Sequence, residues 1–599
     1  MNVGYISDNS AQVHAQVEDM ISRGIAGAIA DWYGVANTSI EDATKLLRNE
    51  AEASSGQFRF AIMEDKGSLF SAAVSNGCDV TAQLISDLTY IASQYESSPA
   101  YIRINGRPLV FFFDVDAFYI DWQRVLSSVP GNPLVLLRGT DGFTKATSDG
   151  GYSWVNIFQN SPFDPELSLQ DSFFQAAQKT SQKLVVGTAF KGFNDTLANW
   201  GTDRVIDQNC GQTWLQSFAE MGKFFSSSNQ LAALQIATWN DYEEGTTIEP
   251  GIDNCVFLVP SQSGSTVSWS VNGQENTIDH YTVFISTDGK NLSSLGDVPT
   301  GTHAIDLSKL ALSADTTYFL YVKALGRPSI QNKMSPAIAY RVGDQPPAAS
   351  LSITQSGDLT YTASAAGSSG NVAKSVIDFG DGTIVNGASA SHTYSVVGTY
   401  LITATVYDSA GASSVAVHQV SAKSSSSGVT VLNPGSGSTV NWPTPVVASA
   451  NSGTPVSAMQ VLVDGSVAYA THGDTLNTAI KVFTGTHQIS IQALDALGNA
   501  IGTASFTVVA EPGDIPPKVV ITLTPMPNIS PTTMLGCTAA SSDADGFVNS
   551  TELQFSDGSK FSTPAALETF PAPGSYTATV TATDIFGATT TASTTFTVP

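Results

Sequence analysis

Histidine, arginine and long apolar runs are scarce in this chain of 599 residues, and each shortage excludes a class of function. His14 is the one histidine of seven that precedes residue 256, so a Ser-His-Asp hydrolase or a His-ligated metal site is hard to build in that part of the chain. The sequence contains no P-loop and no dinucleotide-binding glycine fingerprint. No apolar run approaches the length of a membrane span. We therefore expect neither a cofactor nor a bound metal ion.

Positive charge is the second shortage. The chain has 26 Lys and Arg against 52 Asp and Glu, a formal net charge of -26, and no arginine follows Arg341. Because such a surface repels phosphate backbones and anionic lipids, we expect neither nucleic acid nor a membrane as a partner. We expect a monomer.

Cysteine is too rare to form a disulfide scaffold, and it does not decide the compartment. Cys210 and Cys255 could pair or remain buried thiols, and Cys78 and Cys537 complete the set. The opening residues, MNVGYISDNS, lack the basic and apolar regions of a signal peptide. Charged residues are nevertheless only 13% of the chain, and Ser, Thr, Gly and Ala fill its second half, which is typical of exported β-sandwich arrays. We expect a secreted or cell-surface protein whose N-terminus is truncated.

Helical and strand-like segments alternate through the first 255 residues. Apolar strands separated by helices predict a parallel sheet covered by helices. Eight such units would close into a (β/α)8 barrel, whose catalytic groups lie at the carboxyl ends of the strands. We find seven strand candidates, at residues 25–30, 58–63, 108–113, 133–137, 154–158, 184–189 and 231–238.

Acidic side chains follow several of these strands. Independent surface acids would be scattered over the helices as well, so the clustering predicts an active site. A glycosidase needs two carboxylates and aromatic faces for sugar rings. For Asp114 and Asp116 we favour a turn or helix cap, and for His14 an ordinary helical position. The remaining acids are Asp31, Glu64, Asp65, Asp241 and Glu244.

The segment after the last strand carries a family resemblance. Residues 239–244, WNDYEE, resemble the WNDYGE signature of α-1,3-glucanases, and residues 244–250, EGTTIEP, are similar to the EWHEGTxIEP motif of endo-α-mannosidases and mannanases. Residues 1–255 thus resemble glycoside hydrolase families 71 and 99, which are (β/α)8 barrels acting on α-linked glycans. Residues 30–34, 60–65 and 106–111 also resemble segments of this clan.

The resemblance implies roles for these residues. Glu244 is the expected general acid/base and Asp241 the second carboxylate, while Glu64 or Asp65 orients a water or a sugar hydroxyl and Asp31 binds a hydroxyl. Asn240 and Glu249 are expected to bind substrate. The expected stacking platforms, for which core packing is the alternative, are Trp32, Tyr33, Trp154, Trp239 and Tyr242.

Two departures from the families leave questions open. The chain combines motifs of both families, so linkage and anomeric outcome cannot be carried over: family 71 is associated with inversion, and family 99 with retention through a 1,2-anhydro sugar. The chain also begins after the family's first strand, so we expect a barrel with an open seam and unpaired strand edges.

From residue 256 onward, short alternating strands and Gly, Asp and Ser turns predict four β-sandwich domains. Residues 378–383, 392–394 and 398–400 (DFGDGT, HTY and GTY) match elements of the PKD domain. Proline-rich joints favour an extended rod. The expected domains are a barrel at 1–255, a fibronectin type III-like domain at 256–345, a PKD domain at 346–423, a bacterial Ig-like domain at 428–510 and a PKD-like domain at 518–599.

The sequence therefore predicts a hydrolase of an α-linked polysaccharide, either α-1,3-glucan or α-mannan, with the β domains acting as spacers or carbohydrate binders. Another bacterial or fungal wall polymer is the second possible substrate. The alternative from a different class is a catalytically inactive carbohydrate-binding or adhesion protein.

Overall fold

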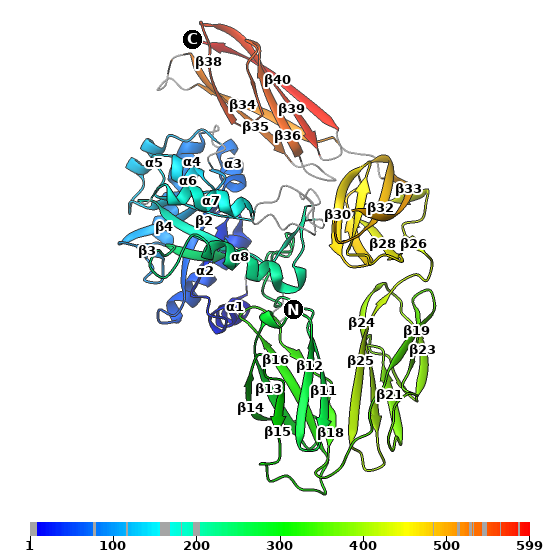
Figure 1. Ribbon diagram of the computed structural model, residues 1–599. Helices are drawn as coiled ribbons and strands as arrows, with labels where there is room; N and C mark the ends of the chain where they lie inside the picture. Colours follow the sequence, from blue (N-terminus) through cyan, green and yellow to red (C-terminus); the bar gives the residue numbers. More distant parts are fainter. Residues whose placement is uncertain are drawn as a thin grey trace.

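The computed structural model shows an α/β region followed by four β-sandwich regions (Figure 1). None of the helices it describes is long and apolar enough to cross a membrane. Cys78 and Asp116, singled out above, lie outside the described residues. The structure describes residues 9–75, 79–115, 118–155, 168–180, 182–195, 204–441, 443–482, 484–511, 516–525, 530, 532–541, 548–562, 565–584 and 588–599.

The α/β region is built on one sheet of seven parallel strands that follow each other in chain order. The short strand β3 (Arg103–Ile104) pairs with β4 in the antiparallel sense. Among the described strands, β1 pairs with β2 alone and β10 with β7 alone, so the sheet is an open part of a barrel. The seven strands are β1 (Gly27–Trp32), β2 (Arg59–Asp65), β4 (Arg107–Phe113), β5 (Leu134–Arg138), β6 (Gly150–Tyr152), β7 (Leu184–Ala189) and β10 (Ala233–Ile236).

The sixth strand lies earlier than predicted. Residues 154 and 155, the described part of the candidate at 154–158, are not in a strand; β6 has the sequence GGY and pairs with β5 and β7. A Cβ atom on Gly150 would lie 2.2 Å from the carbonyl oxygen of Leu184, so only glycine allows this approach. Because two of the three residues of β6 are glycines, the strand has no run of apolar side chains that would predict it from the sequence.

Helices cover the outer face of the sheet (Figure 1). Asn9, Asn37, Asp79 and Asp121 each precede a helix and accept a hydrogen bond from the backbone N–H three residues later, which satisfies one of the free amides of the first turn. The helices are α1 (Ser10–Ser22), α2 (Thr38–Ala53), α3 (Lys66–Ser75), α4 (Val80–Gln94), α5 (Trp122–Ser128), α6 (Asp141–Thr144), α7 (Ser168–Gln178) and α8 (Gln212–Gly222).

Side chains of the sheet alternate between two cores. Along β2, Phe60 and Ile62 pack with the helices in an outer core, whereas Ala61 and Met63 pack inside the curved sheet. Because neighbouring parallel strands are in register, the same parity holds around the sheet and determines which side chains at its carboxyl edge face inward.

Each sandwich region consists of a three-stranded sheet and a larger one. In the first, Trp269 and Tyr281 are buried between the sheets. Its strands are β11 (Phe257–Ser263), β12 (Thr266–Asn272) and β15 (Ala304–Asp306), facing β14 (Ser293–Pro299), β13 (Ile278–Ser286), β16 (Tyr318–Gly326), β17 (Lys333–Met334) and β18 (Ile338–Tyr340). The second has β19 (Ser352–Gly357), β20 (Thr360–Ser364) and β23 (Ser389–Thr393), facing β22 (Ile384–Asn386), β21 (Lys374–Asp378), β24 (Gly398–Tyr407) and β25 (Ser413–Ala422).

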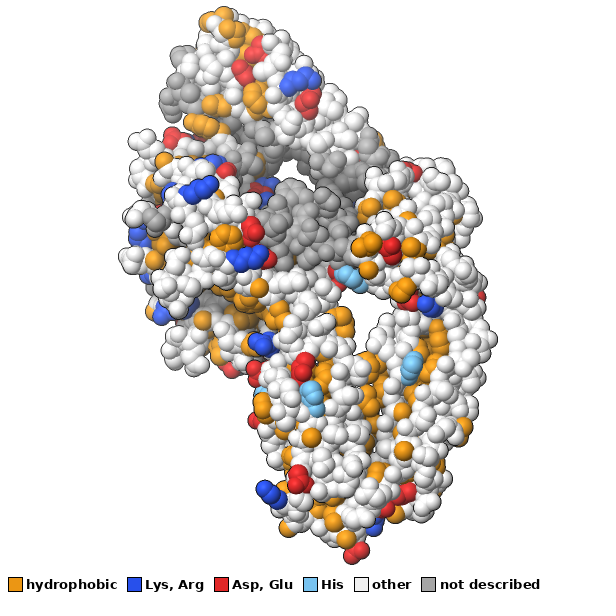
Figure 2. Space-filling view, in the orientation of Figure 1, with side chains coloured by type: hydrophobic (Ala, Val, Ile, Leu, Met, Phe, Trp, Pro, Cys, Tyr) orange, Lys and Arg blue, Asp and Glu red, His pale blue; other side chains and the backbone are white. Residues whose placement is uncertain are grey.

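The third and fourth regions repeat this plan, and Figure 2 shows that uncharged side chains form most of the visible sandwich surface. The third has β26 (Gly428–Asn433), β28 (Thr444–Asn451) and β31 (Thr475–Ile480), facing β27 (Ser438–Val440), β33 (Ala500–Ala510), β32 (Gly485–Leu494), β29 (Ala458–Val463) and β30 (Ser466–His472). The fourth has β34 (Lys518–Pro525), β35 (Thr533–Ser541) and β38 (Ala565–Thr569), facing β37 (Lys560–Phe561), β36 (Val548–Phe555), β39 (Gly574–Asp584) and β40 (Thr589–Val598).

The predicted extended rod is wrong. The second sandwich folds back on the first: Val415 is buried against residues of the first sandwich, and the backbone N–H of Ala339 donates to Ser413 Oγ at 2.7 Å. The third then returns to the α/β region (Figure 1). There, His472 Nδ1 lies 3.0 Å from Asp207 Oδ2. The joint between the first two sandwiches therefore folds the chain back instead of extending it.

Candidate active site

The alternation of the strands separates the predicted acids into two groups. Asp31 shares the parity of Ile29, which packs inside the sheet, and Asp65 shares that of Met63. Trp32 is paired in register with Glu64, and both have the opposite parity. Asp31 and Asp65 therefore face the interior at the carboxyl edge of the sheet, where barrel enzymes hold their catalytic groups.

The prediction of Trp32 as a stacking platform is wrong. Its side chain is fully buried in the outer core, and its indole N–H donates to Glu41 Oε2 at 2.7 Å. Tyr90 and Tyr95 donate to the same carboxylate. This is a buried hydrogen-bond hub that anchors α2 and α4 to the sheet, so the core alternative holds for this residue.

Glu64 does not meet the requirement for a group that touches substrate. It is fully buried, and among the described residues neither of its carboxylate oxygens has a hydrogen-bond partner. Burial raises its pKa well above the ordinary value, and the charge of Asp87 on α4 adds to the shift. Of the two alternatives at the end of β2, Asp65 is therefore the one at the inner edge.

Asp31 lies among other acids at the edge of β1. It is exposed to solvent, yet the surrounding protein reduces its hydration and raises its pKa to about 7, with the charges of Asp65 and Asp241 adding to the shift. A hydrogen bond from Tyr33, a residue that is 39% exposed, opposes the shift. The charges of acids from β2 and from the loop after β10 thus reach Asp31 on β1 and raise its pKa.

The loop after β10 is tightly hydrogen-bonded around Asp241. Its Oδ1 accepts from the backbone N–H of Glu244 at 2.8 Å, and its own N–H donates to Thr238 Oγ1 at 3.1 Å. The hydroxyls of Thr238 and Thr246 lie 2.8 Å apart and close the base of the loop. The peptide bond between Ala237 and Thr238 is cis. Burial raises the pKa of Asp241.

The pKa of Glu244 is raised as well. Burial and then the charge of Asp241 raise its pKa to about 8, and Arg204 opposes the shift. The hairpin of β8 (Phe193–Asn194) and β9 (Val205–Ile206) holds the loop, because the N–H of Asn194 donates to the carbonyl of Glu244 at 2.7 Å. A carboxyl group with this pKa is largely protonated at neutral pH, so it can donate a proton.

The other predicted residues of this loop differ in accessibility. Glu249 is buried and accepts a hydrogen bond from the Tyr242 hydroxyl at 2.8 Å, so it supports the loop and offers no surface to a sugar. Tyr242, Asn240 and Trp239 are half-buried. Trp239 packs into both the outer core and the core around α7 and α8.

Sequence reasoning missed Arg23, which spans the open seam of the sheet. From the end of α1 its guanidinium donates to the carbonyls of Ile248 and Glu249 at 2.8 and 2.7 Å. Its carbon Cζ lies 4.9 Å from the centre of the Trp239 ring. In the sequence, Asp19 and Arg23 form an ordinary (i, i+4) helix pair, which gives no sign of this contact.

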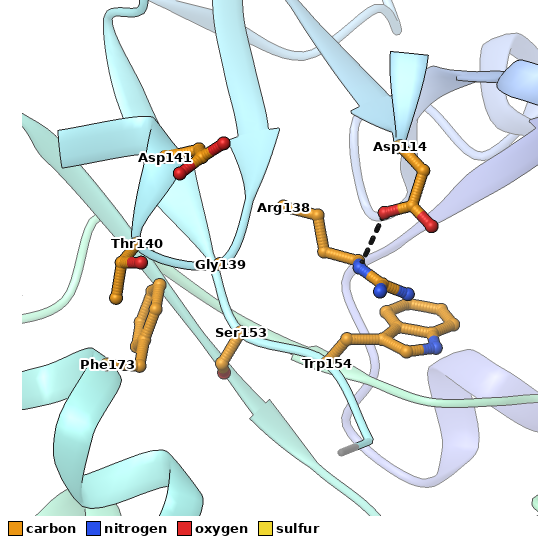
Figure 3. Close-up of a pocket in the computed structure, with 8 residues that line it drawn as sticks. All are labelled: Asp114, Arg138, Gly139, Thr140, Asp141, Ser153, Trp154 and Phe173. Atoms are coloured by element: carbon orange, nitrogen blue, oxygen red, sulfur yellow. Dashed lines mark ion pairs between the residues drawn. The ribbon is translucent and has the colours of Figure 1, made fainter. Parts of the chain in front are cut away.

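Lys191 and Arg138 were also missed. Lys191 follows β7 and is 6% exposed, and burial lowers its pKa to about 8. Arg138 ends β5 beside the predicted platform Trp154, at a cavity of about 250 Å³ (Figure 3).

Within the described residues, no group of three or more His, Cys, Asp or Glu side chains could hold a metal ion.

Cys210 and Cys255 form a disulfide, with their Cα atoms 5.3 Å apart. The bond joins the turn before α8 to the start of the first sandwich. This result settles the alternative that the spacing had left open.

Family models and solved structures match parts of the chain. The model of the PKD domain matches residues 344–422 and 518–598. Among curated proteins, none matches this chain. The PKD1 domain of the Vibrio cholerae metalloprotease PrtV is 26% identical over 13% of this chain and all of that one, with a TM-score of 0.13.

Two further likenesses are more distant. The fibronectin(III)-like modules of Clostridium thermocellum CbhA are 24% identical over 14% of this chain and 95% of that one, with a TM-score of 0.13. A β-glucuronidase of Parabacteroides merdae is 9% identical over 84% of this chain and 60% of that one, and its TM-score of 0.30 is too low to indicate fold or activity. The family model thus identifies two PKD domains within this chain, at 344–422 and 518–598.

Proposed function

We propose that the protein is a secreted glycoside hydrolase that cleaves an α-linked polysaccharide, α-1,3-glucan or α-mannan. One observation carries the proposal. Carboxyl groups from the two open edges of the sheet act on each other, and Glu244 among them has a pKa of about 8. A protonated carboxyl beside further carboxylates is the pair that glycoside hydrolysis requires.

The roles follow from protonation and position. Glu244 donates its proton to the leaving glycosidic oxygen, and Asp241 acts as the second carboxylate. Asp31 and Asp65, which face the same interior, bind sugar hydroxyls or orient a water. Tyr33, Trp239, Tyr242 and Asn240 remain proposed sugar contacts.

The domain assignments complete the proposal. The seven-stranded sheet is proposed as part of a (β/α)8-type barrel, in which no described strand pairs with both β1 and β10. Residues 256–345 are proposed as a fibronectin type III-like domain and 428–510 as a bacterial Ig-like domain, both serving with the PKD domains as spacers or weak carbohydrate binders. The monomeric state and the absence of nucleic acid and membrane partners are part of the same proposal.

The second candidate is a carbohydrate-binding or adhesion protein without activity. The open seam favours it, because unpaired strand edges weaken a barrel.

The test is the release of reducing sugar from α-1,3-glucan, α-1,4-glucan, α-mannan and β-glucan by wild type, Glu244→Gln and Asp241→Asn. Glu52→Gln, an exposed position on α2, is the control. Activity on an α-glycan that the first two substitutions abolish supports the hydrolase; a folded, inactive wild type supports the binding protein.

A further inference from the structure

A polar cavity of about 250 Å³ lies at the carboxyl ends of β4, β5 and β6, on the edge of the sheet that carries the acids. Figure 3 shows Arg138, Asp114 and Trp154 on one side of it and Thr140 and Phe173 on the other. The lining combines aromatic rings with hydrogen-bonding groups of both kinds, donors and acceptors.

Arg138 is held in one orientation at the cavity wall. Its guanidinium carbon lies 4.7 Å from the centre of the Phe113 ring, and its Nε lies 2.8 Å from Asp114 Oδ1. In the described part of the chain, no residue accepts a hydrogen bond from its two terminal nitrogens, although a third of the side chain is exposed. A guanidinium fixed in this way is preorganised to donate to oxygen atoms of a ligand.

Asp114 is held between two cations, which the expected turn or cap role did not include. Its Oδ2 lies 3.1 Å from Lys66 Nζ, and Lys66 directly follows Asp65 at the end of β2. Its backbone has a φ of 54°, a left-handed conformation that is rare for residues other than glycine. Lys66, the residue after Asp65, thus links Asp114 at the cavity to the inner edge of the sheet where Asp65 lies.

The charges of the lining favour a neutral ligand. Asp114 and Asp141 are negative, and each has a cation beside it: Arg138 and Lys66 at Asp114, and Lys145 at 3.3 Å from Asp141. Because each of these cations is already paired with a carboxylate, an acidic sugar would find no unpaired positive charge among them, whereas a hydroxyl group can accept from Arg138 and donate to Asp114. Trp154 supplies an aromatic side chain beside them, half-buried and packed edge-on against Phe113 at 5.4 Å.

We propose that this cavity is a subsite for a neutral pyranose unit, the neighbour of the unit held at the carboxylates. Arg138 and Asp114 bind its hydroxyls, and Trp154 packs against its ring. This inference rests on the proposed function and adds that the site takes at least two consecutive sugars of a polymer. The second unit then adds binding energy only for ligands of two or more sugars.

The test measures binding without turnover in the Glu244→Gln background, by titration calorimetry. The probes are the methyl α-glycosides of glucose and mannose as single units, the α-1,3-linked glucose and α-linked mannose oligosaccharides of five units, and oligogalacturonate as the acidic probe. We expect a five-unit neutral probe to bind more tightly than the one-unit probe. Arg138→Gln should weaken the longer probe roughly ten- to hundredfold and Trp154→Phe about tenfold, with the shorter probe changed less than about twofold.

Arg124→Gln is the matched control, because Arg124 pairs with Asp79 at 2.9 Å on the helix layer and should change neither affinity. Equal losses for short and long probes, no loss at all, tighter binding of oligogalacturonate, or no binding of any neutral probe would each overturn the subsite. The proposed function is tested separately: if Glu244→Gln still hydrolyses substrate, the catalytic assignment fails while the length-dependent binding still decides the role of the cavity.

Discussion

The guanidinium of Arg23 lies 4.9 Å from the centre of the Trp239 ring and donates to the two carbonyls that end the same loop, those of Ile248 and Glu249. This contact crosses the gap between β1 and β10, where the described strands do not pair. The loop that carries Asp241 and Glu244 is therefore positioned from α1, at the opposite edge of the sheet.

Removing this contact should lower both stability and activity. Arg23→Ala breaks two charge-assisted hydrogen bonds, which contribute about 1.5–3 kcal/mol each. We expect kcat to fall at least tenfold because the acids lose their position, and Arg23→Lys to restore it only in part because an ammonium cannot donate as a fork. Arg48→Ala, on the outer helix α2, is the control. An unchanged kcat in Arg23→Ala would contradict this positioning role.

The free energy of unfolding should increase as pH falls from about 8 to 5. Burial raises the pKa of Glu64 well above its ordinary value and that of Asp87 to about 6, so the folded protein binds protons that the unfolded chain has released. The stability that these two carboxyl groups contribute is therefore full below their pKa values in the unfolded chain. It is lost as pH rises through their pKa values in the folded protein. Denaturant unfolding at several pH values measures this slope.

Glu64→Gln tests which group causes the slope. An amide cannot ionise, so the variant should be more stable than wild type at pH 8 and should show a shallower pH dependence. Glu52→Gln, an exposed position on α2, should leave the slope unchanged. If Glu64→Gln and wild type have parallel curves, Glu64 is not the buried proton carrier.

Glu41 should be among the residues most sensitive to substitution outside the site. It is 3% exposed and accepts hydrogen bonds from Trp32, Tyr90 and Tyr95. Glu41→Ala leaves these donors unpaired and should lower the free energy of unfolding by about 3 kcal/mol. Glu52→Ala on the same helix should change it by less than about 0.5 kcal/mol. A loss of the same size in both variants would rule out the hydrogen-bond hub.

The return of the third sandwich to the α/β region depends on His472 and Asp207. Although burial opposes it, the hydrogen bonds from His472 and from the N–H of Asn209 lower the pKa of Asp207. We expect His472→Ala to increase the radius of gyration measured by X-ray scattering, while His418→Ala, on an exposed face of β25, leaves it unchanged. An unchanged radius in His472→Ala would mean that other contacts hold the sandwich in place.

The strands were predictable where apolar runs are bounded by turns, and six of the seven candidates overlap strands of the sheet. The choice between Glu64 and Asp65 was not, because a strand buried on both faces has no visible alternation. The structure shows the alternation: Phe60 and Ile62 pack outward, which places Glu64 on the same outer side. Arg23 and Val415 could not be identified, since their partners lie far away in the chain.

The most direct test of the central claim is the pH dependence of kcat/KM on the α-glycan that the protein hydrolyses. If Glu244 is the proton donor, activity should fall as pH rises through about 8, the pKa that burial and Asp241 give it, and Glu244→Gln should lose at least a hundredfold in kcat/KM. Glu52→Gln should keep the wild-type profile. A Glu244→Gln variant with the wild-type rate and the same pH profile would contradict the account.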